Sequence, residues 1–297
     1  MKPEKVKEIC KKLKKKKKFW KVVRAMPDWY VFNFLISQFH YATGHGSVAS
    51  ILSPDTFNEK LLFRKLKDRS DLKRYVTDKE KLKKYVKNEV GGEYNVKTYE
   101  VIEDREKIDN VNIPEECCIK PTHLSGPVIF RRNGEKVERK KVKKWFKRDR
   151  FWWVRENNYK DLDRKVIFEK LLLGENNSVP NDYKIYCFNG KAKIIYVMKD
   201  RFGEKIKKYA FDKKYNFLGF GNGSHVFEGD LPRKPKKLSE MINVSEELSS
   251  GFDFIRVDMY EVDGRIYVGE LTSWPSNCQK SFHPEWANKF VGRFFDE

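Results

Sequence analysis

The spacing of apolar residues predicts helices in the first third of the chain and mostly strands after it. Apolar residues recur there at three- and four-residue intervals, the period of an amphipathic helix, and Ser, Thr or Asp precede these segments as caps. Helices are predicted over residues 53–76, 77–92, 131–149 and 236–251. Apolar runs bounded by Gly and Pro predict strands within residues 115–130, 165–174 and 182–200. Helices followed by antiparallel strands with interspersed helices indicate an α+β architecture.

One predicted hairpin carries charges in its middle. The segment RVDMYEVDGRIYVGELTSWP, residues 256–275, alternates like two strands but contains Arg256, Asp258 and Glu270. A two-residue turn at Asp263-Gly264 would place the two carboxylates on opposite faces. A three-residue loop ending at Gly264 pairs position 258 with 268 and 256 with 270, and so gathers the three charges on one face. We expect this second loop, with the other face filled by Ile255, Val257, Met259, Tyr267 and Leu271.

The charged face of this hairpin has two explanations. Two carboxylates close together repel each other unless a cation lies between them. Oxygen ligands at this spacing suit Mg²⁺, which takes one or two carboxylates together with substrate phosphates. A surface salt-bridge cluster around Arg256 accounts for the same residues. The residues alone leave both explanations open.

The composition favours anionic partners. The 297 residues include 63 Lys and Arg against 43 Asp and Glu, a net charge of +20, although a Lys-rich proteome gives the same pattern. The basic run at residues 11–26 suits a solvated helix face, or a weak contact with an anionic membrane worth about 1 kcal/mol per Lys. The five Cys are scattered, and no apolar run approaches the roughly 20 residues of a membrane span. We expect a cytoplasmic protein, peripheral at most to the inner membrane face.

Six stretches, in order along the chain, carry a resemblance to a known family. They are PDTFNEKLLFRKLKDR (54–69), KPTHLSG (120–126), FEKLL (168–172), DYKIYCFNGK (182–191), DRF (200–202) and FIRVDMYEVDGRIYVGELTSWP (254–275). With them, the chain resembles the TupA-like branch of the ATP-grasp enzymes. The resemblance implies an ATP-grasp fold whose antiparallel sheets enclose a nucleotide. It divides the chain into a largely helical region (1–114), a small lobe with a phosphate loop (115–172) and a large lobe with a metal site (173–297).

The resemblance implies an ATP-dependent carboxylate–amine ligase that uses Mg²⁺, with Mn²⁺ as a substitute. Such a ligase passes the γ-phosphate of ATP to a carboxylate, and an amine then attacks the acyl phosphate to form an amide. The family's setting is cell-surface polymer synthesis. The expected partners are therefore a nucleotide, a uronic acid or a polysaccharide-linked carboxylate of a capsule or similar polymer, and an amino acid or small amine.

Two alternatives to the ligase stay open. One is an ATP-grasp kinase that phosphorylates a sugar or a carboxylate without an amine. The other is a non-catalytic polyanion-binding protein, which the net charge of +20 favours. The P-loop and protein-kinase motifs are absent from the sequence, and no motif predicts a specific nucleic-acid partner.

The resemblance also implies roles for individual residues. Nucleotide contacts are implied for Lys79 and Lys120 at the phosphates, Ser125 and Gly126 in the phosphate loop, Glu169, Lys170 and Leu172 at the adenine, and Asp182 and Lys184 at the ribose. Metal ligands are implied at Asp258, Glu270 and Thr272. Roles in phosphoryl transfer are implied for Arg256, Arg201, His123 and Ser125, with Lys208 as a further γ-phosphate contact.

The phosphate loop departs from the family's usual sequence. Where the family has HGSGG, this chain has HLSGP, so Leu124 and Pro127 replace two glycines. Pro127 lacks a backbone N–H donor. Closure of the loop over phosphates by backbone N–H groups is therefore expected to be weaker here.

Overall fold

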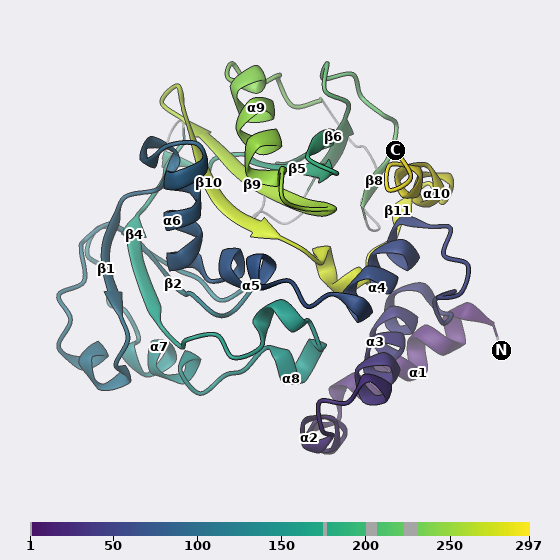
Figure 1. The fold of residues 1–297 in the computed structure, drawn as a ribbon. Helices are drawn as coiled ribbons and strands as arrows, with labels where there is room; N and C mark the ends of the chain where they lie inside the picture. The colour runs from purple at the N-terminus through teal and green to yellow at the C-terminus, as the bar shows by residue number, and fades with distance from the viewer. Residues whose placement is uncertain (1, 175–176, 200–206, 223–230) are drawn as a thin grey trace.

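The strands of the protein form two antiparallel sheets. The computed structural model describes residues 2–174, 177–199, 207–222 and 231–297 (Figure 1). The smaller sheet has the order β1-β4-β2-β3, from β1 (Thr98–Ile102), β4 (Val166–Lys170), β2 (Cys117–Pro121) and β3 (Ile129–Arg131). The larger sheet has the order β10-β9-β5-β6-β7, from β10 (Arg265–Thr272), β9 (Phe254–Val262), β5 (Asp182–Phe188), β6 (Lys191–Lys199) and β7 (Lys207–Phe211). A separate ladder joins β8 (Gly221–Asn222) and β11 (Phe282–His283).

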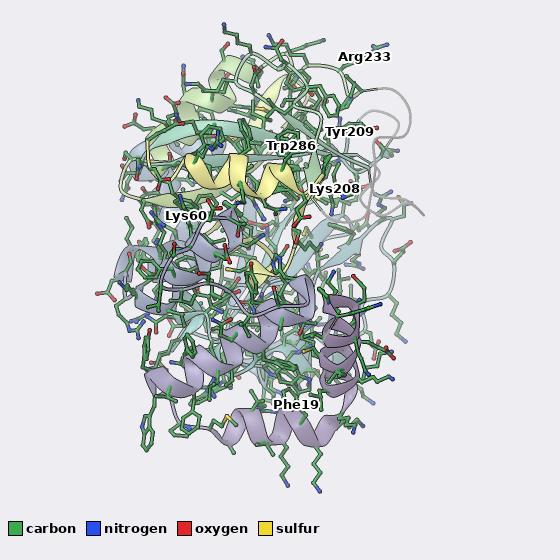
Figure 2. The ribbon with its side chains drawn as sticks, turned by 90° about the vertical axis from the view of Figure 1, so that its right-hand side faces the viewer. Phe19, Lys60, Lys208, Tyr209, Arg233 and Trp286 are labelled. Atoms are coloured by element: carbon green, nitrogen blue, oxygen red, sulfur yellow. The ribbon has the colours of Figure 1, made fainter. Side chains whose placement is uncertain are left out.

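Helices pack around these sheets and form an N-terminal layer. That layer consists of α1 (Pro3–Lys15), α2 (Lys17–Ala25) and α3 (Tyr30–His45). In the side view, α2 with Phe19 lies at the opposite end of the molecule from β7 with Lys208 (Figure 2). The remaining helices are α4 (Phe57–Lys67), α5 (Asp71–Thr77), α6 (Lys79–Glu89), α7 (Arg139–Trp145), α8 (Phe151–Val154), α9 (Leu238–Ser249) and α10 (Trp286–Arg293). None of the helices in the described residues combines the length and apolar character needed to cross a membrane.

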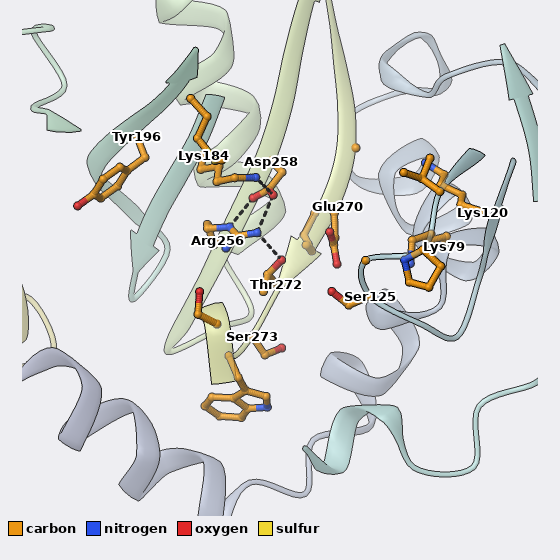
Figure 3. A pocket seen from close by; sticks show the side chains of 18 of the residues that line it. Lys79, Lys120, Ser125, Lys184, Tyr196, Arg256, Asp258, Glu270, Thr272 and Ser273 are labelled. Carbon is orange, nitrogen blue, oxygen red and sulfur yellow. Dashed lines mark hydrogen bonds and ion pairs between the residues drawn. The ribbon is translucent and has the colours of Figure 1, made fainter. Parts of the chain in front are cut away.

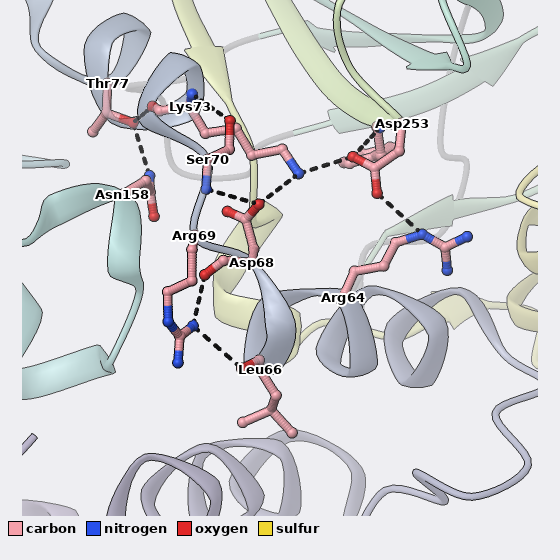
Figure 4. A network of polar contacts seen from close by, with 10 residues as sticks. Arg64, Leu66, Asp68, Arg69, Ser70, Lys73, Thr77, Asn158 and Asp253 are labelled. Atoms are coloured by element: carbon pink, nitrogen blue, oxygen red, sulfur yellow. Dashed lines mark hydrogen bonds and ion pairs between the residues drawn. The ribbon is translucent and has the colours of Figure 1, made fainter. Parts of the chain in front are cut away.

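The helix predicted over residues 53–76 is broken into α4 and α5. Asp68 follows the last residue of α4, and Ser70 caps α5 by accepting a hydrogen bond from the backbone N–H of Lys73 at 3.2 Å. The Lys73 ammonium lies 2.8 Å from Asp253 and 3.4 Å from Asp68, and Arg64 lies 3.2 Å from Asp253 (Figure 4). The break therefore coincides with an ionic cluster that ties both helices to the residue before β9.

One face of the large sheet is covered by helices. Ile185, Ile195, Tyr209 and Val257 pack there with residues of α6 and α9 in a single apolar core. Met241 of α9 is fully buried in this core. The packing fixes which side of each strand faces the helices, because neighbouring residues of a strand point to opposite faces.

The other face of the large sheet is apolar at one end and charged at the other. Along β5 and β9 the paired residues are Phe188–Phe254, Tyr186–Arg256, Lys184–Asp258 and Asp182–Tyr260. The two Phe residues pack against Phe57 of α4. Directly paired residues share a face, so the charged residues project on the same side as this aromatic cluster. There Lys184, Arg256 and Asp258 line a cavity instead of contacting a helix.

The charged hairpin has a register that differs from the expected one. Its turn has two residues, since Val262 pairs with Arg265, and both turn residues have positive φ, 52° at Asp263 and 70° at Gly264. A bulge at Gly269 then shifts the register, so that Asp258 pairs with Glu270 and Arg256 with Thr272. The predicted three-residue loop is therefore wrong, although the charges do share a face.

The bulge at Gly269 depends on the absence of a side chain. A Cβ atom at this position would lie 2.6 Å from Cε2 of Tyr260, which is too close. The two-residue turn reverses the expected orientation of Tyr267, which pairs with Tyr260 on the charged face. Ile266 and Val268 are buried in the core in its place.

The small lobe begins earlier in the chain than expected. β1 lies in the region predicted to be helical, and it pairs with β4 in the small sheet. The basic helix predicted over 131–149 is shorter, as α7. Its Trp145 packs with Cys117, Ile119 and Leu124 in the core of this lobe.

Candidate active site

A cavity of about 460 Å³ lies between the small lobe and the charged face of the large sheet (Figure 3). One wall comes from β2 and the loop after it, and the other from β5, β6, β7, β9 and β10. Residues of the segments 150–159 and 273–280 also line it. A smaller cavity of about 80 Å³ shares wall residues with the first, namely Cys118, Lys120, Phe130, Tyr260 and Gly269.

Arg256 and Asp258, neighbours on the charged face of β9, form a bidentate ion pair. The Arg256 Nε lies 2.5 Å from Asp258 Oδ1, and Nη2 lies 2.6 Å from Oδ2. Lys184 also contacts Asp258, and its Nζ lies 2.8 Å from Asp182. Burial raises the pKa of Asp258, but the two cations outweigh burial and hold it below its usual range. One explanation of the sequence, a salt-bridge cluster around Arg256, is thus correct for Asp258.

Glu270 is in a different position, although it faces Asp258 across the ladder and lines the same cavity. Among the described residues, none forms an ion pair or hydrogen bond with its carboxylate. Directly paired residues have Cβ atoms about 4.5–5.5 Å apart. Two carboxylates therefore lie close together, and the charge of only one is neutralised by side-chain contacts.

These residues fit a magnesium ion held mainly by Glu270. Mg²⁺ is usually bound by one or two carboxylates and completed by substrate phosphates, and no described group of three His, Cys, Asp or Glu could hold a metal by itself. Asp258 can join Glu270 only when Arg256 or Lys184 moves away. Thr272 has the same constraint, because its Oγ1 accepts a hydrogen bond from Arg256 at 3.0 Å.

Glu169 lies at the end of β4 between two lysines. Its Oε2 is 2.5 Å from Lys120 of β2 and its Oε1 is 2.7 Å from Lys83 of α6, and only 3% of its side chain is exposed. Burial raises the pKa of Glu169, but the two ammonium groups outweigh burial and lower it. The same carboxylate raises the pKa of Lys120 despite burial of that lysine. Glu169 thus orients a lysine that faces the large cavity, and Lys83 is a partner that sequence reasoning missed.

The smaller cavity is where the resemblance places adenine contacts. Glu169, Lys170 and Leu172 line it together with Val96, Leu171, Val179 and Pro180. Apart from Lys170 and Glu169 these are apolar residues that suit a planar ring. Asp182, expected at the ribose, is fully buried beside Lys184 and is absent from the lining of either cavity.

The phosphate loop is anchored at Leu124, one of the two positions where its sequence departs from that of the family. Leu124 is 5% exposed and packs in the core of the small lobe. The Lys79 Nζ donates to the Leu124 carbonyl at 2.7 Å, and burial lowers the pKa of Lys79. Ser125, Gly126 and Pro127 line the cavity. Lys79 therefore holds the loop as well as facing the cavity.

His123 lies away from the cavity. Its ring is 4% exposed, its Nε2 lies 3.2 Å from the Trp145 carbonyl, and burial lowers its pKa. The expectation of a catalytic role for His123 is corrected by this placement, because the imidazole packs into the small lobe. Arg201, the other expected contact of the γ-phosphate, lies outside the described residues.

Two lysines face each other at the far side of the cavity. Lys208 of β7 and Lys280 both line it, near Lys184. Burial, together with the charges of Lys280 and Lys184, lowers the pKa of Lys208 to about 8. Cations gathered in this way suit an anionic ligand, which would offset their mutual repulsion.

Several lining residues were not predicted. Arg150, Glu156, Asn158 and Tyr159 come from a segment without a motif, and Ser273, Trp274 and Lys280 follow the charged hairpin. Trp274 lies in the TSWP sequence at the end of the charged hairpin segment. The only signal for its place in the cavity was that it lies two residues after Thr272, an implied metal ligand. For the segment 150–159 no local signal existed, since a long-range contact brings it to the large sheet.

The fold and the cavity define an ATP-grasp protein. A family model described as TupA-like ATPgrasp matches residues 59–296, which is most of the chain. The chain therefore belongs to the TupA-like ATP-grasp family, as its motifs predicted. No curated protein matches the sequence.

Solved structures give weaker similarities. The D-alanine–D-alanine ligase of Bacillus anthracis complexed with ATP is 17% identical, with a TM-score of 0.37, over 67% of this chain and 54% of its own. The phosphoribosylamine–glycine ligase of Thermotoga maritima is 14% identical, with a TM-score of 0.41, over 68% and 48%. The ATP-grasp ligase PsnB complexed with minimal precursor is 11% identical, with a TM-score of 0.38, over 69% and 53%. The matched part thus spans about half of each structure, and at these values the similarities carry no argument about substrates.

Proposed function

We propose that this protein is a magnesium-dependent ligase that activates a carboxylate with ATP and joins it to an amine. One observation carries the proposal. The cavity combines a row of cations, an apolar side cavity and a carboxylate, Glu270, that forms no ion pair or hydrogen bond with a described side chain. Cations suit phosphates, the side cavity suits adenine, and the carboxylate suits the metal that accompanies a nucleoside triphosphate.

This match of charge and polarity supports one orientation of the nucleotide across the two cavities. Adenine enters the smaller cavity beside Leu172, and Lys120, which lines both cavities, reaches the phosphates. Glu169 keeps the Lys120 ammonium charged and directed. The backbone of Ser125 and Gly126 adds N–H groups to the phosphates, as oriented amides do in anion-binding loops.

Glu270, together with Asp258 and Thr272, would hold magnesium, which would supply positive charge to offset that of the phosphates. Release of Asp258 by Arg256 would leave the guanidinium free to bind the transferring phosphoryl group. Lys184 and Lys208 add charge on the same side of the cavity. Preorganised cations in a cavity shielded from water are usually the largest contribution to such a reaction.

The proposed reaction has two steps. A carboxylate oxygen attacks the γ-phosphorus, the bond to the β–γ bridging oxygen breaks, and ADP leaves with that oxygen. The amine nitrogen then attacks the acyl carbon, the bond from that carbon to the phosphorylated oxygen breaks, and inorganic phosphate leaves. The amine, which enters as an ammonium, loses two protons, one to the departing phosphate, which leaves as HPO₄²⁻, and one to solvent, so that atoms and charges balance.

The substrates follow from the family and from charge. Membership of the TupA-like family and the cationic cavity support a uronic acid, free or within an anionic cell-surface polysaccharide such as a capsule, as the carboxylate. An amino acid or small amine supplies the nitrogen. The basic helices α1 and α2 support a peripheral contact with an anionic membrane surface where such polymers are assembled.

Hydroxylamine trapping tests the proposal. Wild type is incubated with Mg²⁺–ATP, hydroxylamine and a panel of uronic acids. An acyl phosphate gives a hydroxamate and one ADP, whereas a sugar kinase gives ADP and a stable phosphate ester without hydroxamate. A carboxylate kinase also gives hydroxamate, but its ADP release, unlike that of a ligase, does not depend on an amine. Lys120→Ala should abolish both products, and Lys84→Ala, an exposed lysine on α6, serves as the control. ADP without hydroxamate for every acid would favour the kinase, and no ADP at all would favour a binding protein.

A further inference from the structure

One end of the cavity is lined by buried polar atoms that lack partners. Glu156 is 2% exposed, Asn158 4%, Ser273 1% and Trp274 3%, and all four line the cavity. Within the described ranges, no hydrogen-bond partner exists for Glu156 Oε1, Asn158 Oδ1, Ser273 Oγ or Trp274 Nε1. Arg150, which lines the same end, has an equally unpartnered Nε. Buried polar atoms are normally hydrogen-bonded, so a group of five points to a missing ligand.

The surroundings do not supply these partners. The Asn158 amide nitrogen donates to Thr77 Oγ1 at 2.8 Å, which leaves its oxygen for the cavity. The Arg150 Nε lies 3.6 Å from Glu156 Oε2, a charge contact without a hydrogen bond. Lys65, the nearest other cation, donates to the Val154 carbonyl and to Asn277. The groups are therefore held in place, and these five atoms have no hydrogen-bond partner among the described residues.

The free atoms divide into two chemical kinds. Glu156 and Asn158 present oxygens that accept hydrogen bonds, with a negative charge on the first. Arg150, Trp274 and Ser273 present donors, with a positive charge on the first. An ammonium group complements the acceptors and a carboxylate complements the donors. A molecule that carries both groups on neighbouring atoms satisfies the whole set.

We propose that this end of the cavity, the Arg150–Glu156 subsite, binds a free α-amino acid as its zwitterion. The α-ammonium lies against Glu156 and Asn158, and the α-carboxylate against Arg150 with Trp274 and Ser273. The inference rests on the proposed ligase function and specifies its amine substrate as an amino acid, to the exclusion of a simple amine.

The position of the subsite suits an attacking amine. Glu270, the proposed metal ligand, lines the same cavity, and its charge acts on both Arg150 and Glu156. Burial raises the pKa of Glu156, and the charges of Arg150 and Lys65 oppose this rise. The wall is completed by a turn in which Ser276, Asn277 and Cys278 have φ of 53°, 51° and 58°. Non-glycine residues in this conformation are uncommon and concentrate at functional sites.

Matched pairs of nitrogen donors test the inference with wild-type protein. Amide formation is measured with alanine against ethylamine, and with glutamate against 4-aminobutyrate, at fixed ATP and uronic acid. The amines without the α-carboxylate should have a kcat/KM lower by about tenfold or more, the usual effect of losing hydrogen bonds to a charged group. Equal kcat/KM within each pair would overturn the subsite.

Variants locate the effect. Arg150→Gln should lower the ratio of kcat/KM for alanine to kcat/KM for ethylamine. Trp274→Phe, which removes only the N–H donor, should lower this ratio by a smaller factor. Arg148→Gln, an exposed arginine two residues away, should leave the ratio unchanged. A ratio that Arg150→Gln and Trp274→Phe both leave intact would contradict the subsite. The wild-type pairs decide the matter if Arg150→Gln does not fold.

The two proposals fail in different ways. Absence of hydroxamate in wild type with every uronic acid would overturn the ligase function and this inference with it. Hydroxamate formation without discrimination between amino acids and amines would overturn the amino-acid subsite alone.

Discussion

Asp258 and Glu270 face each other across β9 and β10, yet only Asp258 is paired with cations in the described structure. This difference gives Asp258 a structural role and leaves Glu270 for binding, although both belong to one motif. Asp258 neutralises Arg256 and Lys184 while the nucleotide is absent. Glu270 keeps a carboxylate available for a cation. Metal binding must then compete with ion pairs at Asp258 but not at Glu270.

Asp258→Asn and Glu270→Gln should therefore differ in stability. Repulsion between the two carboxylates would by itself make both changes neutral or slightly stabilising. The structure contradicts this for Asp258, because Asp258→Asn removes the carboxylate that pairs with the largely buried Arg256 and leaves Lys184 with Asp182, and a loss of about 3 kcal/mol or more is expected. Glu270→Gln should stay within about 0.5 kcal/mol of wild type. Urea unfolding without metal measures both, and equal stabilities would contradict the asymmetry.

Glu169→Gln should destabilise the protein in a pH-dependent way. The folded-state pKa of Glu169 is lower than its ordinary value of 4.5. Its contribution is therefore complete above pH 4.5 and is lost as the pH falls through the folded-state pKa. The variant should lose about 3–5 kcal/mol at pH 7, as for a broken buried pair, and this difference should shrink in acid. Glu89→Gln, an exposed residue of α6, is the control for unfolding measured at both pH values.

Lys208 should take up a proton when an anion binds. Its folded-state pKa of about 8 lies below its ordinary value of 10.5. The unfolded chain thus holds this proton over a wider range, so stability should rise with pH between about 8 and 10.5. A phosphate group nearby favours the charged lysine. Calorimetry of Mg²⁺–ATP binding at pH 8.5 in buffers of different ionisation enthalpy should show proton uptake that Lys208→Arg abolishes. Equal uptake by the variant would assign the proton to another group.

The two substitutions in the phosphate loop should behave differently. Leu124 fills the core of the small lobe, so Leu124→Gly should cost about 3 kcal/mol or more. Pro127→Gly restores an N–H donor beside the cavity and should keep or lower the KM for ATP. A large rise in that KM would show that the proline shapes the loop for binding.

The sequence predicted correctly that the charges of the hairpin share one face, but it predicted the wrong turn and register. It identified Arg256, Asp258 and Glu270 as residues of one face, but by an expected three-residue loop. The actual register depends on a bulge at Gly269, which requires close approach to Tyr260, a contact that neighbouring residues along the chain do not reveal. Motif resemblance likewise found Lys120 and Glu169 but not Lys83, their shared partner.

The segment 150–159 shows where sequence reasoning ended. Arg150 and Glu156 do not have the spacing of any known motif. Their place in the cavity is visible only in the fold, which brings them beside residues more than 100 positions later in the chain. The helix break at Asp68 was missed for a similar reason. Helical spacing continues through the break, whereas the partner that stabilises it, Asp253, belongs to the large lobe.

The most direct test of the central claim follows one oxygen atom. A uronic acid that gives hydroxamate is labelled with ¹⁸O in its carboxylate and incubated with Mg²⁺–ATP and an amino acid, and the inorganic phosphate is analysed by mass spectrometry. If the cavity transfers the γ-phosphoryl group to the carboxylate, each phosphate released with an amide should carry one ¹⁸O atom, and Glu270→Gln should release almost none. Unlabelled phosphate formed together with the amide would contradict an acyl phosphate and the account built on it.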